Sequence, residues 1–129
     1  MGGGNVSKKF YLIKDGKVKV GFSGNHTESG GTFNFNVTDN SVISEDVNIN
    51  KYNNLFCYYY APLNSENRFS DLIVGIYQNN TQTAYNRGSY KTQWATLRID
   101  ISALNSWCDI RLNTDIGATI QIKNLWLSK

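Results

Sequence analysis

The sequence has little of what most catalytic and metal sites need. Its 129 residues include two cysteines and one histidine. Zinc sites take several closely spaced cysteine and histidine ligands, so this composition excludes the common types. The histidine, His26, lies in a polar stretch. There we expect it to be solvated or to bond within a turn, rather than to act as a base or a metal ligand.

Long apolar runs and a strong charge excess are also missing. No apolar run approaches the 18 residues that span a membrane, and the start, MGGGNVSKK, lacks the apolar segment of a signal peptide. The net charge is only +3, and the later arginines are scattered among acids. We therefore expect neither a nucleic acid nor a membrane as partner, and a location in the cytoplasm or, for an excised module, outside the cell.

The acidic residues form no recognisable catalytic pair. A glycosidase needs two carboxyl groups facing each other across a cleft, but most acids here fall in predicted loops. Asp100 and Asp109 are explained by pairing with Arg98 and Arg111 on a sheet surface. No phosphate loop, dinucleotide fingerprint or nucleophile elbow occurs, so we do not expect an enzyme. Oxygen ligands at 38–40 and 44–46 could hold a structural Ca²⁺ but match no calcium loop; we expect no other cofactor.

What the sequence does contain is a series of short β-prone segments bounded by Asn, Gly, Ser or Asp. They predict strands at 10–14, 17–23, 32–38, 55–61, 71–78, 93–101, 107–113 and 118–127, with a further short strand within 39–49. Asp15-Gly16 predicts a hairpin turn, 23–31 a loop, and 102–106 a helical turn at most. We expect one all-β domain over 10–129, an antiparallel two-sheet β-sandwich of jelly-roll type, after a linker or cloning remnant at 1–9. A closed barrel is the alternative.

Period-two alternation assigns the faces of two later strands. Their aliphatic sides, expected to face the core, are Ala95, Leu97, Ile99 and Ile101 in one strand and Cys108, Ile110 and Leu112 in the other. The opposite sides are Trp94, Thr96, Arg98 and Asp100, and Trp107, Asp109 and Arg111. If the short link makes these strands neighbours, the two tryptophan-bearing sides lie side by side.

The stretch NNLFCYYYAP, residues 53–62, divides in the same way. One side consists of Leu55, Cys57, Tyr59 and Ala61, which resembles the other core sets; the other is an aromatic ladder of Phe56, Tyr58 and Tyr60. We interpret the ladder as facing outward, with the reverse assignment open because a core also takes Phe and Tyr. Cys57 and Cys108 then both face inward. Two buried thiols are expected, since a bridge would need an oxidising compartment and close Cα atoms.

Aromatic residues are the strongest chemical signal. A sugar ring presents an apolar face of C–H groups and a rim of hydroxyls, so its site needs a flat ring and polar side chains. The candidate platform residues are Tyr58, Tyr60, Tyr85, Tyr90, Trp94 and Trp107, and the candidate polar partners are Arg98, Asp109 and Arg111. The alternative for each ring is a role as core or sheet cover. Trp126, in the alternating IQIKNLWL, is assigned to the core or to a domain contact.

The order of three motifs resembles a family. Tyr52 with Leu55, the turn from Asp100 to Leu104, and the ending Ile122, Leu125, Trp126, Leu127 are similar to the Y-x-x-L, D-I-S-x-L and I-x-x-I-W-L motifs of small β-sandwich modules. Those modules occur near the ends of bacteriophage and prophage tail and fibre proteins. The resemblance covers roughly 10–128, and its motifs are mainly structural.

The resemblance implies a jelly-roll module, similar to carbohydrate-binding modules, attached to a virion protein. We therefore expect a non-catalytic module that binds a bacterial surface glycan as part of a phage tail or fibre, located in the virion. The alternative is a structural virion module that decorates a capsid or tail, or trimerises a fibre, through contacts with other virion proteins. A stable homotrimer would favour that alternative.

Overall fold

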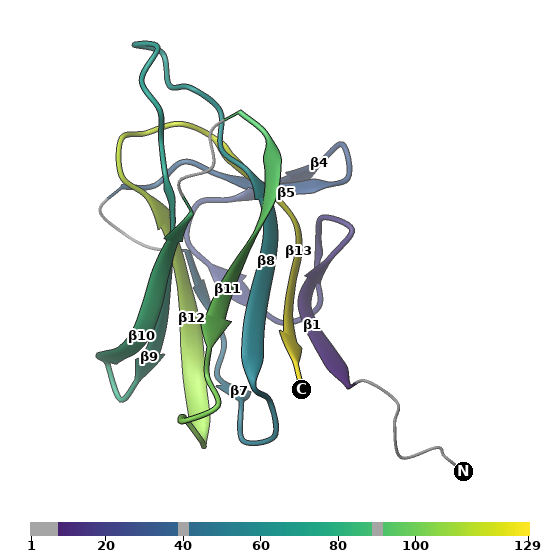
Figure 1. Cartoon of the computed structure of the whole chain (residues 1–129). Coiled ribbons are helices and arrows are strands. Elements are labelled where there is room, and N and C mark those ends of the chain that lie inside the picture. The colour runs from purple at the N-terminus through teal and green to yellow at the C-terminus, as the bar shows by residue number, and fades with distance from the viewer. Residues whose placement is uncertain (1–7, 39–41, 89–91) are drawn as a thin grey trace.

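The chain folds into two antiparallel β-sheets packed face to face, as predicted (Figure 1). The computed structural model describes residues 8–38, 42–88 and 92–129. Over these residues the strands are β1 (Lys9–Lys14), β2 (Lys17–Val18), β3 (Phe22–Ser23), β4 (Thr27–Ser29), β5 (Thr32–Phe35), β6 (Val42–Ser44), β7 (Val47–Asn48), β8 (Asn54–Tyr60), β9 (Leu72–Gln78), β10 (Thr81–Gly88), β11 (Trp94–Asp100), β12 (Trp107–Thr114) and β13 (Ile120–Ser128). In this described part there is no helix, hence none that could cross a membrane.

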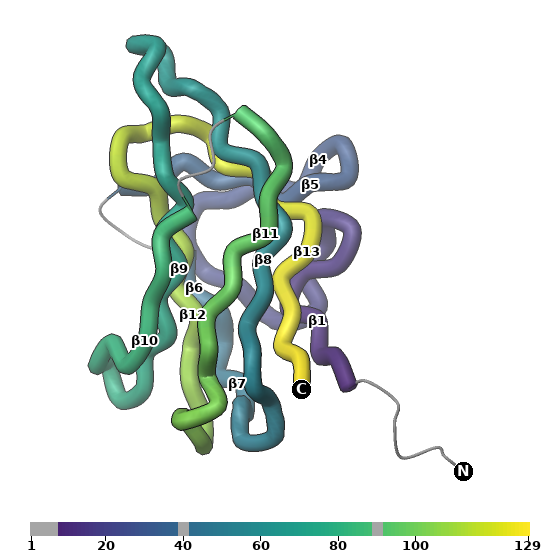
Figure 2. The backbone as a smooth tube through the Cα atoms, in the orientation of Figure 1, coloured from purple at the N-terminus to yellow at the C-terminus, as the bar shows by residue number. Residues whose placement is uncertain are grey.

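Both sheets combine pairs of consecutive strands with pairs of strands that are distant in the sequence. The seven-stranded sheet has the order β11-β8-β13-β1-β2, with β5 beside the start of β13 and β4 beside β5; the six-stranded sheet has the order β10-β9-β12-β6-β3, with β7 beside β12. Because β1 pairs with β13, the first and last strands run side by side, which Figure 2 shows as purple and yellow tubes. The first and last described strands are thus tied together within the seven-stranded sheet.

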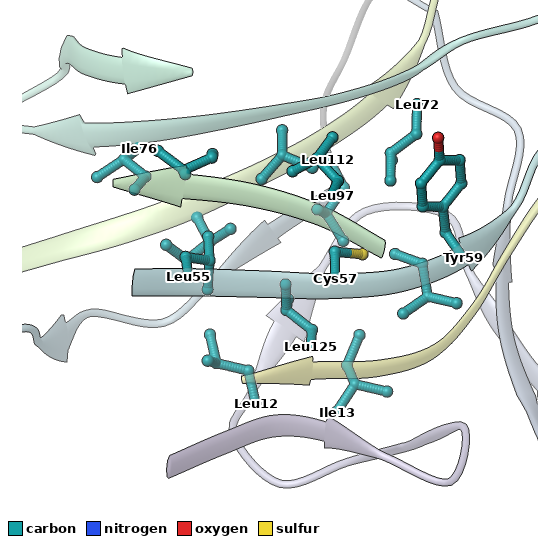
Figure 3. Packing of buried hydrophobic residues seen from close by; sticks show 14 of the residues in the cluster. Leu12, Ile13, Leu55, Cys57, Tyr59, Leu72, Ile76, Leu97, Leu112 and Leu125 are labelled. Carbon is teal, nitrogen blue, oxygen red and sulfur yellow. The ribbon is translucent and has the colours of Figure 1, made fainter. Parts of the chain in front are cut away.

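The core lies between the sheets and uses the predicted faces. Leu55, Cys57 and Tyr59 of β8 are buried and alternate with half-buried outer residues. Leu97 and Ile99 of β11, and Ile110 and Leu112 of β12, point into the same cluster, whose packing is shown in Figure 3. Burial of such aliphatic side chains is the main favourable term in folding. The prediction that Phe56, Tyr58 and Tyr60 occupy the outer face of their strand is confirmed.

Four details of the strand prediction were wrong. The single short strand predicted within 39–49 is two strands, β6 and β7, both paired with β12. β10 was not predicted, because its sequence TQTAYNRG has no apolar alternation: it is an edge strand, paired with β9, and mostly exposed. β4 lies inside the predicted loop 23–31, and the predicted strand 17–23 is two short strands, β2 and β3, in different sheets.

Trp126 is not a core residue. β13 contains a bulge, a register shift between Ile122 and Asn124. A bulge inserts one residue and so reverses the alternation beyond it. Ile122 points inward before the bulge and Leu125 after it, which leaves Trp126 half-buried on the outer face.

The two predicted tryptophan-bearing sides do not lie side by side. β11 pairs with β8 in one sheet and β12 pairs with β9 in the other. Trp94 and Trp107 therefore belong to opposite outer surfaces of the sandwich. The predicted single constellation separates into two.

Cys57 and Cys108 are both buried and unbridged. Burial raises the pKa of the Cys57 thiol, and burial with the nearby charges of Asp109 and Asp46 raises that of Cys108 to about 12. Only the thiolate form of a cysteine reacts, so both thiols should be unreactive in the folded protein.

We expect neither thiol of the native protein to react with DTNB at pH 8, and both to react in guanidinium chloride. A rapid reaction of one thiol in the native protein would contradict this packing.

Candidate functional site

The outer surface of the six-stranded sheet carries one candidate site, which we call the Trp107 face. It consists of the outward side chains of β9, β10 and β12: Ile73, Tyr77, Gln82, Tyr85, Trp107, Asp109, Arg111 and Asn113. Strand pairing orders them into rows across the sheet. Asp109 is opposite Tyr77, and Arg111 is opposite Gly75, which in turn is opposite Tyr85.

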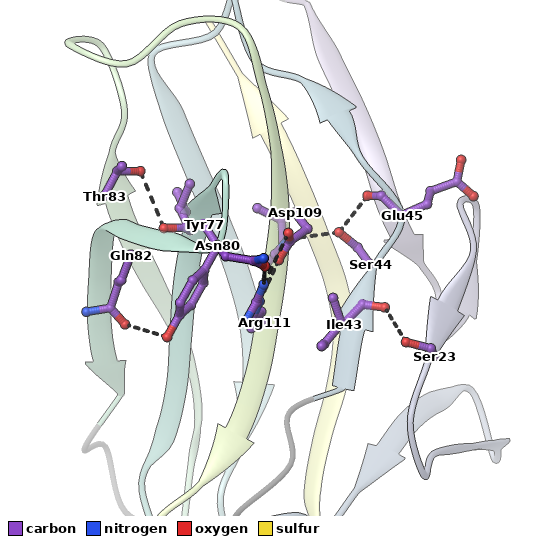
Figure 4. A network of polar contacts seen from close by, with 12 residues as sticks. Ser23, Ile43, Ser44, Glu45, Tyr77, Asn80, Gln82, Thr83, Asp109 and Arg111 are labelled. Atoms are coloured by element: carbon purple, nitrogen blue, oxygen red, sulfur yellow. Dashed lines mark hydrogen bonds and ion pairs between the residues drawn. The ribbon is translucent and has the colours of Figure 1, made fainter.

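Arg111 is held in a fixed orientation at the centre of this face (Figure 4). Its Nε donates to Asp109 Oδ1 at 2.7 Å, and its Nη2 donates to Asn80 Oδ1 at 3.1 Å. The guanidinium carbon lies 3.9 Å from the centre of the Tyr77 ring, a cation–π contact. The hydrogen bond to Asp109 raises the pKa of Arg111 above its ordinary value, so the group is charged at every working pH.

This fixation leaves hydrogen-bonding capacity for a ligand. A guanidinium has five N–H donors, and within the described residues Nη1 of Arg111 has no partner. Because the side chain is already ordered, a ligand that accepts these bonds does not have to immobilise it.

Gly75 makes the arrangement of Tyr77 and Arg111 possible. A Cβ at position 75 would lie 2.8 Å from Cε1 of the Tyr77 ring and 3.2 Å from Oε1 of Gln82. The tyrosine ring therefore leans over the glycine. Gln82 accepts a hydrogen bond from the Tyr77 hydroxyl at 3.1 Å, which further fixes that ring.

Two aromatic rings with open faces flank this polar centre. Trp107 is 57% exposed and Tyr85 is 56% exposed. In the part of the chain that the structure describes, no other ring and no cation packs on either of them. Trp107 and Asp109 are two positions apart on β12, so their side chains emerge about 7 Å apart. An apolar ligand face can lie on the indole while its rim reaches Asp109 and Arg111.

The outer surface of the seven-stranded sheet, the Trp94 face, differs in its aromatic packing. It consists of the outward side chains Tyr11, Phe56, Tyr58, Tyr60, Trp94, Thr96, Arg98 and Trp126. Trp94 stacks on Tyr58 with ring centres 5.2 Å apart, and Trp126 stacks on Phe56 at 5.3 Å. These rings cover one another, and most are half-buried.

Arg98 lies away from the Tyr58–Trp94 pair, nearer to the end of β11. Its Nε donates to Asn54 Oδ1 at 2.7 Å, and its Nη2 lies 3.8 Å from Asp100 Oδ2. The structure thus separates the predicted ligand-binding residues into Tyr58, Tyr60, Trp94 and Arg98 on one surface and Trp107, Asp109 and Arg111 on the other. Tyr90 lies outside the described residues.

The other candidate groups have structural partners. His26 Nδ1 lies 2.8 Å from Gly24 O, within a turn, and its ring stacks on Phe33. Ser44 Oγ accepts the hydrogen bond of Ile110 N, and Glu45 Oε2 accepts that of Gly21 N. Among the described residues no group of three metal-ligating side chains occurs. Asp39, part of the possible Ca²⁺ ligand set, lies outside the described residues.

Sequence reasoning missed Tyr77, Gly75 and Asn80. Tyr77 follows the alternation of β9, so its outward direction was readable from LIVGIYQ. Its contact with Arg111 was not readable, because the two residues meet only through pairing of β9 with β12. Asn80 has a positive φ in the turn before β10, and an asparagine pair there is a recognisable turn signal.

The comparisons with known proteins concern the fold. No protein-family profile matches the chain, and no curated protein matches it. Solved structures do match. A variant of the module CBM29-2, of family 29 carbohydrate-binding modules, complexed with cellulohexaose has a TM-score of 0.69 at 15% identity, over 95% of this chain and 91% of that chain.

Two further structures are similar over nearly the whole of this chain. A structure described as CBM4 structure and function has a TM-score of 0.55 at 12% identity, over 94% of this chain and 86% of that chain. A family two carbohydrate esterase from Cellvibrio japonicus has a TM-score of 0.58 at 12% identity, over 95% of this chain but only 33% of that chain. The chain therefore has the jelly-roll β-sandwich fold of carbohydrate-binding modules, as predicted from the sequence.

Proposed function

We propose that the chain is a non-catalytic carbohydrate-binding module that binds its glycan on the Trp107 face. The observation that carries the proposal is the open indole of Trp107, 57% exposed, in line with the fixed Asp109–Arg111 pair. The indole stacks on the apolar face of a sugar ring. Asp109 accepts from sugar hydroxyls, and Arg111 Nη1 donates to sugar oxygens. The similar structures that are carbohydrate-binding modules support the same class of ligand.

We further propose that the module belongs to a phage tail or fibre protein, where it contacts a glycan of the bacterial surface. This placement rests on the motifs at Tyr52, Asp100–Leu104 and Ile122–Leu127. It predicts a ligand among bacterial cell-surface glycans rather than plant wall polysaccharides.

A glycan array that carries both bacterial and plant glycans tests this proposal. We expect selective binding of the wild-type protein, and for Trp107→Ala a loss of about 30-fold in affinity at the Trp107 face, since a central tryptophan contributes about 2 kcal/mol or more. Because Trp107 is exposed, Trp107→Ala should change the free energy of unfolding by less than about 0.5 kcal/mol. Phe69→Ala, which removes a ring that is 50% exposed in the loop before β9, is the matched control.

Three outcomes of the array are informative. Equal binding by the wild-type and Trp107→Ala proteins would exclude the Trp107 face as the site. Silence across the whole array would contradict carbohydrate binding. Binding restricted to plant glycans would contradict the placement at a bacterial surface.

A further inference from the structure

We propose that the Trp94 face holds a second, independent carbohydrate-binding site, so that one chain binds two glycan segments on opposite surfaces. The class of ligand rests on the proposed function; the site itself rests on a separate set of residues. An open depression of about 580 Å³ lies on this face, lined by Tyr58 and Trp94 and by Asp15, Thr32 and Lys123 beside Gly30 and Gly31. Its size is within the range of small-molecule sites.

Two turns that are fixed to each other form one wall of the depression. The turn at Asp15-Gly16 is held on β13, because Gly16 N donates to Lys123 O at 2.8 Å and Asp15 N donates to Asn124 Oδ1 at 3.0 Å. The backbone at Gly31 packs directly against Gly16. The wall is therefore preformed, which lowers the entropic cost of binding.

The bulge in β13 lies at the foot of this wall. The register shift between Ile122 and Asn124 makes Lys123 the additional residue. Lys123 is exposed and lines the depression. Bulges commonly redirect a side chain next to a functional site.

The two charged groups of the depression are available to a ligand. Within the described residues, neither the Asp15 carboxylate nor the Lys123 ammonium has an ion-pair or hydrogen-bond partner. A carboxylate and an ammonium supply acceptors and donors at one wall. Vicinal hydroxyls of a sugar can bond to both groups, while the opposite charges give the site no preference for an ionic ligand.

The opposite side of the depression is aromatic. Trp94 is 38% exposed, stacks on Tyr58 and lies 5.7 Å from Tyr60, measured between ring centres. These contacts hold the indole in place across β8 and β11. Rings opposite polar groups, in an open and rigid depression, match a sugar with its apolar face and hydroxyl rim. A surface for a protein partner would be more uniformly apolar and would lack unpaired charges at its centre.

Indole N–H signals in ¹⁵N NMR spectra separate the two sites, because the Trp94 and Trp107 faces each carry their own tryptophan reporter. Trp94→Phe and Trp107→Phe assign the signals. The probes are cellohexaose and the soluble oligosaccharide with the strongest array signal. We expect the Trp94 signal to shift along its own saturable curve, and to do so unchanged in the Trp107→Ala protein, in which the first site is lost.

Variants that keep the rings of Tyr58 and Trp94 test the polar wall of the depression. Asp15→Asn and Lys123→Gln should each weaken binding at the Trp94 signal about tenfold and leave the Trp107 curve within about twofold, since each removes a hydrogen bond to a charged group. Lys17→Gln, which removes a charge outside the depression, should change neither curve.

The titrations distinguish failure of the second site on the Trp94 face from failure of the proposed function at the Trp107 face. A Trp107 signal that titrates while the Trp94 signal stays fixed would overturn the second site and leave the proposed function standing. If neither the Trp94 signal nor the Trp107 signal shifts with either probe, both the second site and the proposed function are overturned. A Trp94 signal that shifts with protein concentration alone, with a dimer or trimer in light scattering, would instead make this face a contact between protein chains.

Discussion

Gly16→Ala is expected to lower the free energy of unfolding by about 3 kcal/mol and to destroy the depression on the Trp94 face. Gly16 has a φ of 78°, a left-handed conformation that costs an L-residue about 1–2 kcal/mol. An added Cβ would also collide with the backbone of Gly31 and Thr32. Backbone atoms cannot move aside as a flexible side chain can, so overpacking adds about 1–3 kcal/mol.

Gly30→Ala is the matched control for this prediction. Gly30 also has a positive φ, 64°, but nothing lies within 4 Å of a Cβ built there. Only the conformational cost of about 1–2 kcal/mol remains. Urea unfolding of the three proteins measures the difference. Equal destabilisation by both substitutions would show that the contact between the two turns does not stabilise the fold.

The double variant Trp94→Ala/Trp107→Ala is expected to lose all measurable glycan binding. The two tryptophans are on opposite surfaces and share no contact, so their effects should be independent and additive. Each single variant should keep one functional site and lose the ability to cross-link long polysaccharide chains. Bivalent attachment strengthens binding to a repetitive ligand without any new contact, so the double variant should lose more than either single variant.

Folding of the double variant must be checked separately. Trp107 is exposed and its loss should be nearly neutral, whereas Trp94 stacks on Tyr58 and contacts Tyr60. Such aromatic pairs contribute about 0.5–1.5 kcal/mol each. Trp94→Phe keeps a ring at this position and serves as the conservative comparison in thermal unfolding.

The sequence predicted the faces of individual strands well because alternation is a local property. In β8, β11 and β12 apolar side chains recur at alternate positions, and all of them except the half-buried Ala95 are buried. The hairpin turn at Asp15-Gly16 was predictable for the same reason, since its two residues alone favour the required positive φ values.

Strand pairing could not be predicted from the sequence. β11 and β12 are neighbours in the chain but belong to different sheets, and each pairs with a strand that lies well before it. Their outer side chains therefore face opposite directions in space. The residues predicted to form one ligand-binding site therefore lie on two surfaces. Strand pairing depends on contacts between distant segments, which no local sequence pattern encodes.

Local irregularities caused the remaining errors. The bulge in β13 reversed the alternation and moved Trp126 from the expected core to the surface, where it stacks on Phe56. β10 lacks an apolar face because it is an edge strand. These features depend on the neighbours of each strand rather than on its own residues.

Affinity electrophoresis tests the central claim most directly, that exposed tryptophans on the outer surfaces bind glycan. Native gels would contain the polysaccharide that corresponds to the strongest array signal, and the wild-type, Trp107→Ala and double-variant proteins would run beside a non-binding reference protein. The account predicts strong retardation of the wild-type protein, weaker retardation of Trp107→Ala and none of the folded double variant. Equal retardation of the wild-type and double-variant proteins would contradict it.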